Sequence, residues 1–501
     1  MKKILINQNP WESRVSIVRN GTLENIFFGQ STDKVIERSF FKGSVAKVLP
    51  GIQTAFVDIG QERAGFLHVS EIDRDLALNR IMGPDQIELD DDIRPKVSPE
   101  KIDISKILKD GEDLLVQVSK EPVDEKGAKL TTCFTFPGRF VVLTPNIAKI
   151  GVSKKIEDKL ERVRLKEIVA KHIPSGMGAV IRTSAETRTE EEIYKDLSFL
   201  IADWNKILSL YEKATSKSKI YEDVDISLQV IRDHLDNDVE AIVTDNAINY
   251  DLIYKYVNKV APDYKFKVKK YHGKQPLFDR YEIDQQIQKA LEPKVQLPSG
   301  GSIVIDTTEA LTVIDVNTGK FIGKGDMEET VLKTNVEAAK EIVLQLKLRN
   351  IGGLIVIDFI DMSNQKNRQK LVVYFEKALK EFDRFQSVVL QVSEFGIVQM
   401  TRKRSGKTLM RQLMDDCHHC KGLGQLMSTR AECYQVLRDI KRVLSQHKDK
   451  NILLSLNEMS FHFITSIEFN SILALEAEFN CHIVLSIDET LKKNEFRLKN
   501  K

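Results

Sequence analysis

The sequence predicts a multidomain α/β protein, and three observations lead to that fold class. The chain has 501 residues, roughly three to four times the usual domain length, so two or more domains are expected. Hydrophobic residues make up 42% of the chain and charged residues 30%, which suffices for several cores and excludes a fibrous or globally disordered protein. Segments with the two-residue alternation of strands come first, and strand–helix–strand units follow them.

Charge and cysteine content narrow the class of protein further. The 75 basic and 73 acidic residues leave a net charge of +2, so any affinity for a polyanion depends on how the charges are distributed. Five cysteines, unevenly spaced, do not form a disulfide framework, which indicates a reducing compartment. The N-terminus lacks the apolar run of a signal peptide, and no stretch approaches the roughly 18 apolar residues that would cross a bilayer. We therefore predict a cytoplasmic protein.

The first 120 residues predict short strands. KILINQ, RVSIV and TLENIFF open the chain, and Asn20-Gly21 between the last two favours a hairpin turn. From about Phe40 the alternation is typical of a five-stranded barrel, with an acidic loop insertion at 85–103. Phe56 and Phe66 lie on neighbouring strands of this barrel, where they could stack on nucleic-acid bases or could equally be core residues.

The middle of the chain mixes strands and helices up to about Leu291. A charged helix is expected at 156–173, a strand in GMGAVIRTS, and a second helix from about Glu190 to Leu210. Arg182 and Thr183 close that strand and pair a planar guanidinium with a hydroxyl, a combination suited to a terminal phosphate.

Between Gly300 and Leu390 the pattern is strand, strand, helix, strand, helix, strand. The first helix carries one apolar stripe, formed by Leu332, Val336, Ala339, Val343 and Leu346. The strands SIVID, LTVID and GLIVID are nearly continuous apolar runs, so we expect a sheet covered by helices on both faces.

Two aspartates end neighbouring strands of this sheet and could carry chemistry. Asp315 ends LTVID and Asp358 ends GLIVID, so their carboxylates should converge where open α/β sheets bind ligands. Two carboxylates without histidine suit Mg²⁺, whereas the alternative is that both only cap strand ends. Asn317, on the same face if the strand persists, could orient a phosphate or a water.

Cys417 and Cys420 form a single CxxC pair. Because a structural zinc site needs four ligands, a site shared between two chains would satisfy zinc and predicts a symmetric dimer. The alternative is an intrachain site completed by His418 or another residue. Cys133, Cys433 and Cys481 are expected to be buried.

Long sequence blocks resemble a known family. LPSGGSIVIDTTEALTVIDVN, EETVLKTNVEAA and LRNIGGLIVIDFIDM are similar to the catalytic region of the ribonuclease E/G family of bacterial endoribonucleases. The resemblance implies an RNase H-like unit (1–38 and 226–291) with an inserted OB-fold RNA-binding domain (39–128) and 5′-sensor region (129–225). A DNase I-like catalytic α/β domain (292–412), a zinc-link (413–425) and a small C-terminal domain (426–501) would follow.

The resemblance also implies roles for individual residues. Asp315 and Asp358 match the magnesium ligands and Asn317 the asparagine that assists them. Cys417 and Cys420 match the zinc-link between two protomers. The residues that match the RNA-binding positions are Phe56, Phe66 and Lys126. The positions that sense a 5′-monophosphate are matched by Arg182 and Thr183, together with the backbones of Gly138 and Val142.

The chain departs from the family pattern in several respects. CHHC replaces the usual CPxC at the link, Lys154 stands where an arginine helps the sensor, and the acidic insertion at 85–103 is expected close to the RNA path. Because the sequence ends at Lys501 without a degradosome scaffold, it resembles the shorter ribonuclease G type.

We therefore predict a magnesium-dependent endoribonuclease that cuts single-stranded RNA, leaves a 5′-phosphate and a 3′-hydroxyl, and prefers 5′-monophosphorylated substrates. It would act in rRNA and tRNA processing and in mRNA decay, as a zinc-linked homodimer that could pair into a tetramer. The alternative is a non-catalytic RNA-binding protein, which would gain nothing from two converging negative charges.

Overall fold

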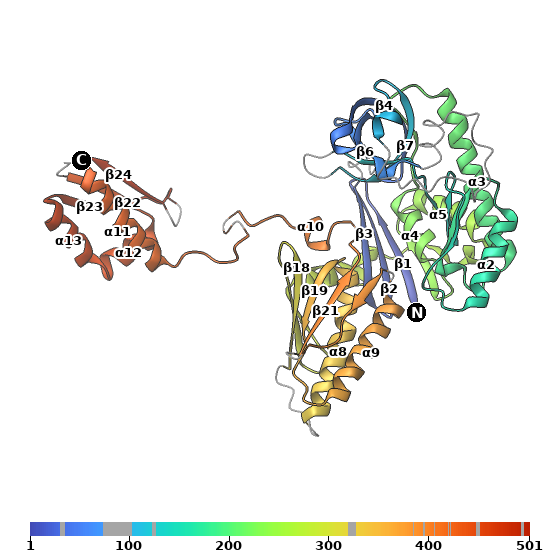
Figure 1. Ribbon diagram of the computed structural model, residues 1–501. Coiled ribbons are helices and arrows are strands. Elements are labelled where there is room, and N and C mark those ends of the chain that lie inside the picture. The colour runs from blue at the N-terminus through green and yellow to red at the C-terminus, as the bar shows by residue number, and fades with distance from the viewer. Residues whose placement is uncertain are drawn as a thin grey trace. The chain divides into compact units, whose positions relative to one another are not determined.

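The computed structural model describes the chain in several stretches (Figure 1). The described residues are 1–30, 36–73, 103–122, 127–318, 327–383, 385–393, 396–404, 406–418, 420, 422–446, 451–491 and 495–500. They form two compact units, Met1–Leu409 and Met410–Lys501. Both units mix helices and strands, which confirms the α/β multidomain prediction. Within these stretches, no helix has the length and apolarity needed to span a membrane.

A five-stranded sheet joins the start of the chain to residues more than 200 positions later. Its strands, in spatial order, are β3 (Thr22–Gln30), β2 (Glu12–Arg19), β1 (Lys2–Gln8), β14 (Val239–Thr244) and β15 (Val268–Lys270). β1 is antiparallel to β2 and parallel to β14. Asn20 and Gly21 have φ angles of 53° and 86°, so the predicted hairpin turn is confirmed.

Helices cover both faces of this sheet. Ile4 and Ile6 pack with apolar side chains of α4 (Ile226–His234) and α5 (Ala247–Val260). Leu5, on the opposite face, packs with α6 (Leu277–Arg280), α7 (Ile283–Leu291) and Leu409 at the start of α10 (Leu409–Leu413). The sheet core therefore joins segments that are distant in sequence.

The predicted five-stranded barrel is confirmed. It consists of β4 (Phe40–Leu49), β5 (Thr54–Asp58), β6 (Gly65–His68), β8 (Lys129–Thr131) and β7 (Asp113–Lys120), and pairing of β4 with β7 closes it. Phe41, Val57, Leu67, Val116 and Leu130 lie in its core. The fifth strand, β8, begins just beyond the boundary expected at residue 128, and β13 (Ser218–Tyr221) adds to β4 from outside the barrel.

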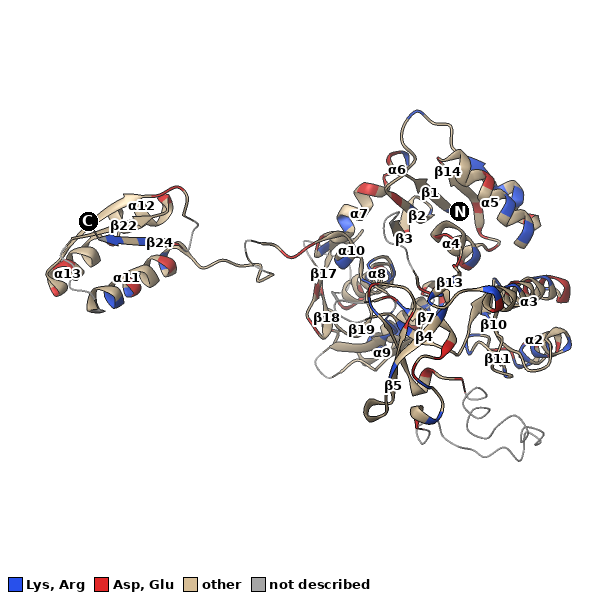
Figure 2. Ribbon diagram, turned by 90° about the horizontal axis from the view of Figure 1, so that it is seen from above, with Lys and Arg blue, Asp and Glu red and all other residues tan. Residues whose placement is uncertain are grey.

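A four-stranded sheet follows the barrel. Its order is β11 (Ile150–Val152), β12 (Gly178–Ile181), β10 (Val141–Thr144) and β9 (Phe136–Pro137). Both predicted helices are present, as α2 (Lys159–His172) and α3 (Glu190–Lys213), and they share a core with the sheet. Basic and acidic residues are interleaved along both helices (Figure 2), so neither helix is uniformly charged.

The third sheet contains the two candidate aspartates. Its strands, in order, are β16 (Lys294–Gln296), β17 (Ser302–Thr307), β18 (Leu311–Asn317), β19 (Gly353–Asp358), β21 (Ile397–Arg402) and β20 (Ser387–Val389). Helices α8 (Met327–Leu348) and α9 (Gln365–Phe382) lie side by side along one face (Figure 1). The predicted stripe of α8 contacts this core through Ala339, Val343 and Leu346, which are at most 2% exposed.

The expectation that helices cover both faces of this sheet is wrong. On the face opposite α8 and α9, Val313, Leu354 and Val388 are 37%, 55% and 53% exposed. Among the strand pairs that the structure describes in this sheet, β18–β19 is parallel and the others are antiparallel. Antiparallel strands commonly leave one face to solvent, which the apolar runs did not indicate. We call the face that carries Val313, Asp315, Asn317, Leu354 and Asp358 the open face.

The C-terminal unit is a small α/β fold. Its sheet has the order β23 (His482–Ile487), β22 (Asn451–Leu456), β24 (Phe496–Asn500), with β22 parallel to β23. Its helices are α11 (Thr429–Gln446), α12 (Glu458–Ser466) and α13 (Phe469–Phe479).

Candidate functional site

The two candidate aspartates are neighbours on the open face. Asp315 lies in β18 directly opposite Asp358, the last residue of β19, in the parallel ladder. Burial alternates along β18, and the strand continues through Asn317, so Asp315 and Asn317 point to the same side. The Nδ2 group of Asn317 donates a hydrogen bond to Oδ2 of Asp315 over 2.8 Å. The structure therefore brings these three predicted residues together on one face of the sheet.

We call Asp315, Asp358 and Asn317 the acidic centre, and its electrostatics favour the binding of a cation. Partial burial raises the pKa of Asp358, and the negative charges of Asp315 and Asp361 raise it further. A divalent cation would relieve that repulsion. In the described parts of the chain, no group of three or more His, Cys, Asp or Glu residues is arranged as a metal site. Two exposed carboxylates suit Mg²⁺, because this ion keeps several waters and takes few protein ligands.

Asn335 of α8 positions the loop between Asp358 and Asp361. Its side chain is fully buried, donates to the Ile360 carbonyl over 2.9 Å and accepts from the Ile360 amide over 3.1 Å. Both hydrogen bonds hold the same peptide segment, so the loop has little freedom beside the acidic centre. Sequence reasoning missed this residue, although a polar residue within the buried stripe of α8 was a usable signal.

One residue predicted to contact RNA, Lys126, lies outside the described residues.

The aromatic pair of the barrel forms one exposed patch. Phe56 of β5 lies directly opposite Phe66 of β6, and the exposed Lys47 of β4 is the other neighbour of Phe56. Phe56 is 36% exposed and Phe66 is half-buried, which rules out a core role for Phe56. An aromatic pair beside a lysine could stack bases and contact their phosphates.

Arg182 and Gly138 meet at one end of the four-stranded sheet. Nη1 of Arg182 donates to the Gly138 carbonyl over 2.6 Å and to Oδ1 of Asp233 over 2.7 Å. Thr183 follows Arg182 and is exposed, and Val142 lies in the neighbouring strand opposite Val180. The amide of Gly138 already donates to the Val141 carbonyl over 2.8 Å, so in this structure it is not free to bind a ligand.

A buried carboxylate stabilises the turn after Gly138. Asp196 of α3 accepts hydrogen bonds from the amides of Arg139, Phe140 and Val141 over 3.0, 2.7 and 3.1 Å. A side chain placed at Gly138 would clash with Asp196, because its Cβ would lie 2.6 Å from Oδ2. Asp196 was missed because its partners are distant in sequence.

Lys154, the residue at the sensor position where the family has an arginine, is exposed. It follows Ser153, whose amide donates to the carbonyl of Ile181, the residue before Arg182.

The CxxC pair lies in the C-terminal unit. Cys417 is exposed and Cys420 is half-buried, with the Cys420 carbonyl accepting from the Leu423 amide over 2.9 Å. Cys433 is fully buried in the core of that unit, as expected, whereas Cys133 and Cys481 are only half-buried. Burial and nearby Asp73 and Glu71 raise the pKa of Cys133 to about 11. Among the described residues, Cys417 and Cys420 thus place two thiols three positions apart in the chain, a spacing found in zinc sites.

Comparison with known proteins identifies the family. A family model described as the Ribonuclease E/G family matches residues 135–405, more than half of the chain. The chain belongs to the ribonuclease E/G family. A second family model, described as the RNase E/G thioredoxin-like domain, matches residues 416–501, a region for which the sequence predicted only a small domain.

Several members of the family are similar along most of the chain. Ribonuclease G of Escherichia coli K12 is 35% identical over 494 residues, covering 99% of this chain and 98% of the relative. Ribonuclease G of Haemophilus influenzae is 38% identical over 441 residues, covering 88% and 87%. Ribonuclease E of the same organism is 33% identical over 499 residues, which span 52% of that relative.

Proposed function

We propose that this protein is an endoribonuclease that cuts single-stranded RNA at the acidic centre on the open face. The observation that carries the proposal is the placement of Asp315 opposite Asp358 on parallel strands, with Asn317 bonded to Asp315. Membership of the family and the names of its relatives support RNA as the substrate. A non-catalytic RNA-binding protein is disfavoured, because paired carboxylates repel a polyanion unless a cation lies between them.

The residues in and beside the acidic centre would have different roles in cleavage. Asp315 and Asp358 would hold Mg²⁺, which supplies a Lewis acid for the scissile phosphate and a polarised water. Asn317 restrains one carboxylate oxygen of Asp315, and Asn335 fixes the loop after Asp358. The exposed Val313 and Leu354 provide apolar surface beside the carboxylates for sugars or bases. Cleavage would leave a 5′-phosphate and a 3′-hydroxyl.

The direct test is cleavage of a fluorescent single-stranded oligoribonucleotide by purified protein with and without Mg²⁺. Cleavage in Mg²⁺ that stops on chelation supports the proposal, and binding without cleavage under both conditions would favour the RNA-binding alternative. Mapping the 5′ and 3′ ends of the fragments checks the proposed products.

The barrel would bind the RNA strand through its aromatic pair. Phe56→Ala should weaken binding of single-stranded RNA about fivefold or more, because stacking of a base on an aromatic ring contributes about 1–3 kcal/mol. Fluorescence anisotropy with a labelled oligonucleotide measures the affinity. Phe266→Ala is a matched control, since Phe266 is 72% exposed but lies outside the barrel. An equal loss in both variants would contradict a specific platform at Phe56.

The Arg182 region would favour a 5′-monophosphate. Only Nη1 of Arg182 is used in the contacts described above, which supports binding of a terminal phosphate by the rest of the guanidinium. A hydrogen bond to a charged group contributes about 1.5–3 kcal/mol, so a 5′-monophosphorylated substrate should be cut about tenfold faster than its 5′-hydroxyl twin. Arg182→Ala should erase most of that difference in kcat/KM, and Arg182→Lys should restore only part of it. Equal rates for both substrates with the unaltered protein would contradict the proposal.

We further propose a cytoplasmic homodimer, joined by zinc bound to Cys417 and Cys420 of each chain, that acts in rRNA and tRNA processing and mRNA decay. The exposure of Cys417 and the limit of two ligands at suitable spacing support a shared site.

A further inference from the structure

The Arg182 guanidinium already holds an anion from its own chain. Asp233, near the C-terminal end of α4, accepts from Nη1 of Arg182 over 2.7 Å, and both side chains are just over one-quarter exposed. A ligand that binds Arg182 from solvent would therefore meet a carboxylate already paired with it. This contact joins two segments 51 residues apart and had no signal in the sequence.

A second arginine, Arg232, lies near the same carboxylate oxygen of Asp233 that Arg182 contacts. Nε of Arg232 is 3.6 Å from Oδ1 of Asp233, too far for a hydrogen bond. In the described structure, Nε and Nη2 of Arg232 are buried without a hydrogen-bond partner. Such unsatisfied buried donors are unfavourable, so Arg232 would gain from a closer Asp233. The Nη1 group of Arg232 is held by Asp223 over 3.3 Å, which keeps the guanidinium in place.

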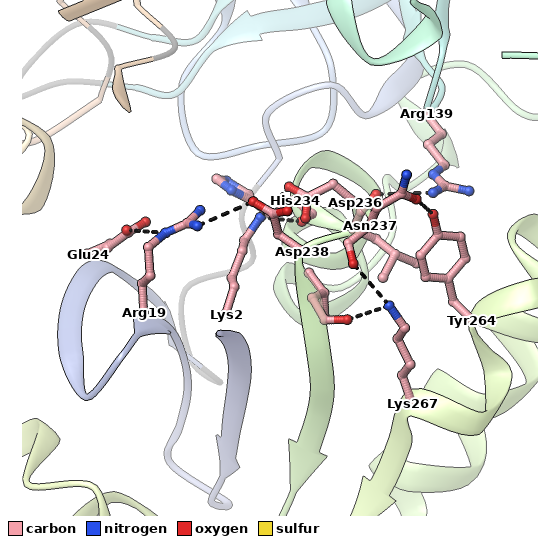
Figure 3. Close-up of polar contacts among 12 residues, drawn as sticks. Lys2, Arg19, Glu24, Arg139, His234, Asp236, Asn237, Asp238, Tyr264 and Lys267 are labelled. Carbon is pink, nitrogen blue, oxygen red and sulfur yellow. Dashed lines mark hydrogen bonds and ion pairs between the residues drawn. The ribbon is translucent and has the colours of Figure 1, made fainter. Parts of the chain in front are cut away.

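The segment that comes after Asp233 in the chain is anchored by side chains from other elements, and Figure 3 shows its residues His234, Asp236, Asn237 and Asp238. Nζ of Lys2 donates to the His234 carbonyl over 2.8 Å and also pairs with Asp236. Nη2 of Arg139 donates to the Leu235 carbonyl over 3.1 Å. With the main chain fixed, a change of partner by Asp233 requires only rotation of its side chain.

We propose that Asp233 is a specificity-determining residue that competes with the RNA 5′-phosphate for Arg182. Without a phosphate it pairs with Arg182, and when a phosphate binds it moves to Arg232. The inference rests on the proposed binding of a 5′-phosphate at Arg182. Burial alone would raise the pKa of Asp233, but Arg182, Arg232 and Arg38 together hold it below the usual range, so the competitor is ionised at neutral pH. A terminal phosphate carries about −1.5 to −2 charge at pH 7, enough to displace a single carboxylate.

The test is a binding measurement without Mg²⁺, so that it does not depend on cleavage. Asp233→Asn keeps an oxygen acceptor and removes the charge. Its affinity for a 5′-monophosphorylated oligonucleotide should rise about fivefold relative to the 5′-hydroxyl twin, as expected for loss of a partly exposed ion pair. Asp233→Glu, which retains the charge, should bind like the unaltered protein. Asp236→Asn is the matched control, because it removes a carboxylate paired with Lys2 from the same segment.

The outcomes separate this inference from the proposed 5′-phosphate preference. If the unaltered protein discriminates between the two oligonucleotides and Asp233→Asn shows no gain, competition is overturned and the preference stands. If only Asp233→Asn discriminates, competition is supported and the preference of the unaltered protein fails. If neither discriminates, both fail. The double variant Arg182→Ala/Asp233→Asn should lose the gain, and Asp233→Ser is the second charge-removing variant if Asp233→Asn does not fold.

Discussion

Replacing Asp315 or Asp358 by asparagine is expected to abolish RNA cleavage while leaving RNA affinity similar or higher. Each substitution removes a carboxylate that would bind Mg²⁺ and, with it, a negative charge that repels the substrate. Loss of metal assistance should lower kcat by about a thousandfold, which corresponds to about 4 kcal/mol. Single-turnover cleavage of a labelled oligonucleotide, together with its binding affinity, measures both effects.

Asp306→Asn is the matched control for this experiment. Asp306 is an exposed carboxylate of the same sheet, but it lies opposite Val313 and not opposite the acidic pair.

The pKa of Asp358 also predicts how the stability of the fold depends on pH. Because burial and neighbouring carboxylates raise the pKa of Asp358, its ionisation is unfavourable in the folded state, and the stability of the fold should decrease as the pH rises through that pKa. Asp358→Asn should therefore melt no lower than the unaltered protein at neutral pH without metal. In the cleavage experiment, near-normal activity of Asp315→Asn or of Asp358→Asn would overturn the assignment of these two aspartates as metal ligands.

Zinc removal is expected to convert the protein from dimer to monomer. The described residues provide Cys417 and Cys420 at ligand spacing, and a closed structural site requires four ligands, so the dimer should contain half a zinc atom per chain. Cys417→Ser should release the metal and shift the protein to monomer. Elemental analysis and light scattering on the same sample measure zinc content and mass.

The control for the zinc experiment is Cys481→Ser. Cys481 is half-buried in the same unit and is not expected to bind zinc, so this variant should remain a zinc-containing dimer. One zinc atom per chain would instead indicate an intrachain site completed by His418 or another residue. A Cys417→Ser variant that stays dimeric without metal would show that another surface joins the protomers.

Features with a local signal could be predicted from the sequence. The Asn20-Gly21 turn, the barrel strands and the stripe of α8 all follow from residue preferences or from periods of 2.0 and 3.6 residues. The pairing of Asp315 with Asp358 was predictable because both aspartates end apolar runs and the helix between them allows a parallel connection.

Features that depend on distant segments could not be predicted in this way. The contacts of Asp233 with Arg182 and of Asp196 with the turn after Gly138 join residues more than 50 positions apart. The open face was mispredicted because an apolar run is compatible with exposure on one side when neighbouring strands are antiparallel. No local pattern pairs β1 with β14, and only the family resemblance grouped residues 1–38 with 226–291.

The pairing of β1 with β14 also sets the order in which the chain can fold during synthesis. Lys2 at the start of β1 lies opposite Val239, so the first strand made must wait for more than 230 residues before its parallel neighbour exists. The barrel and the four-stranded sheet lie within that interval and can form first, because domains generally fold as units as they are synthesised. Until β14 arrives, the β1–β2–β3 hairpins have an unpaired edge and an uncovered apolar face, a state prone to aggregation. A ribosome that pauses before residue 239 would therefore prolong the time during which this strand edge and this apolar face of the nascent chain stay exposed.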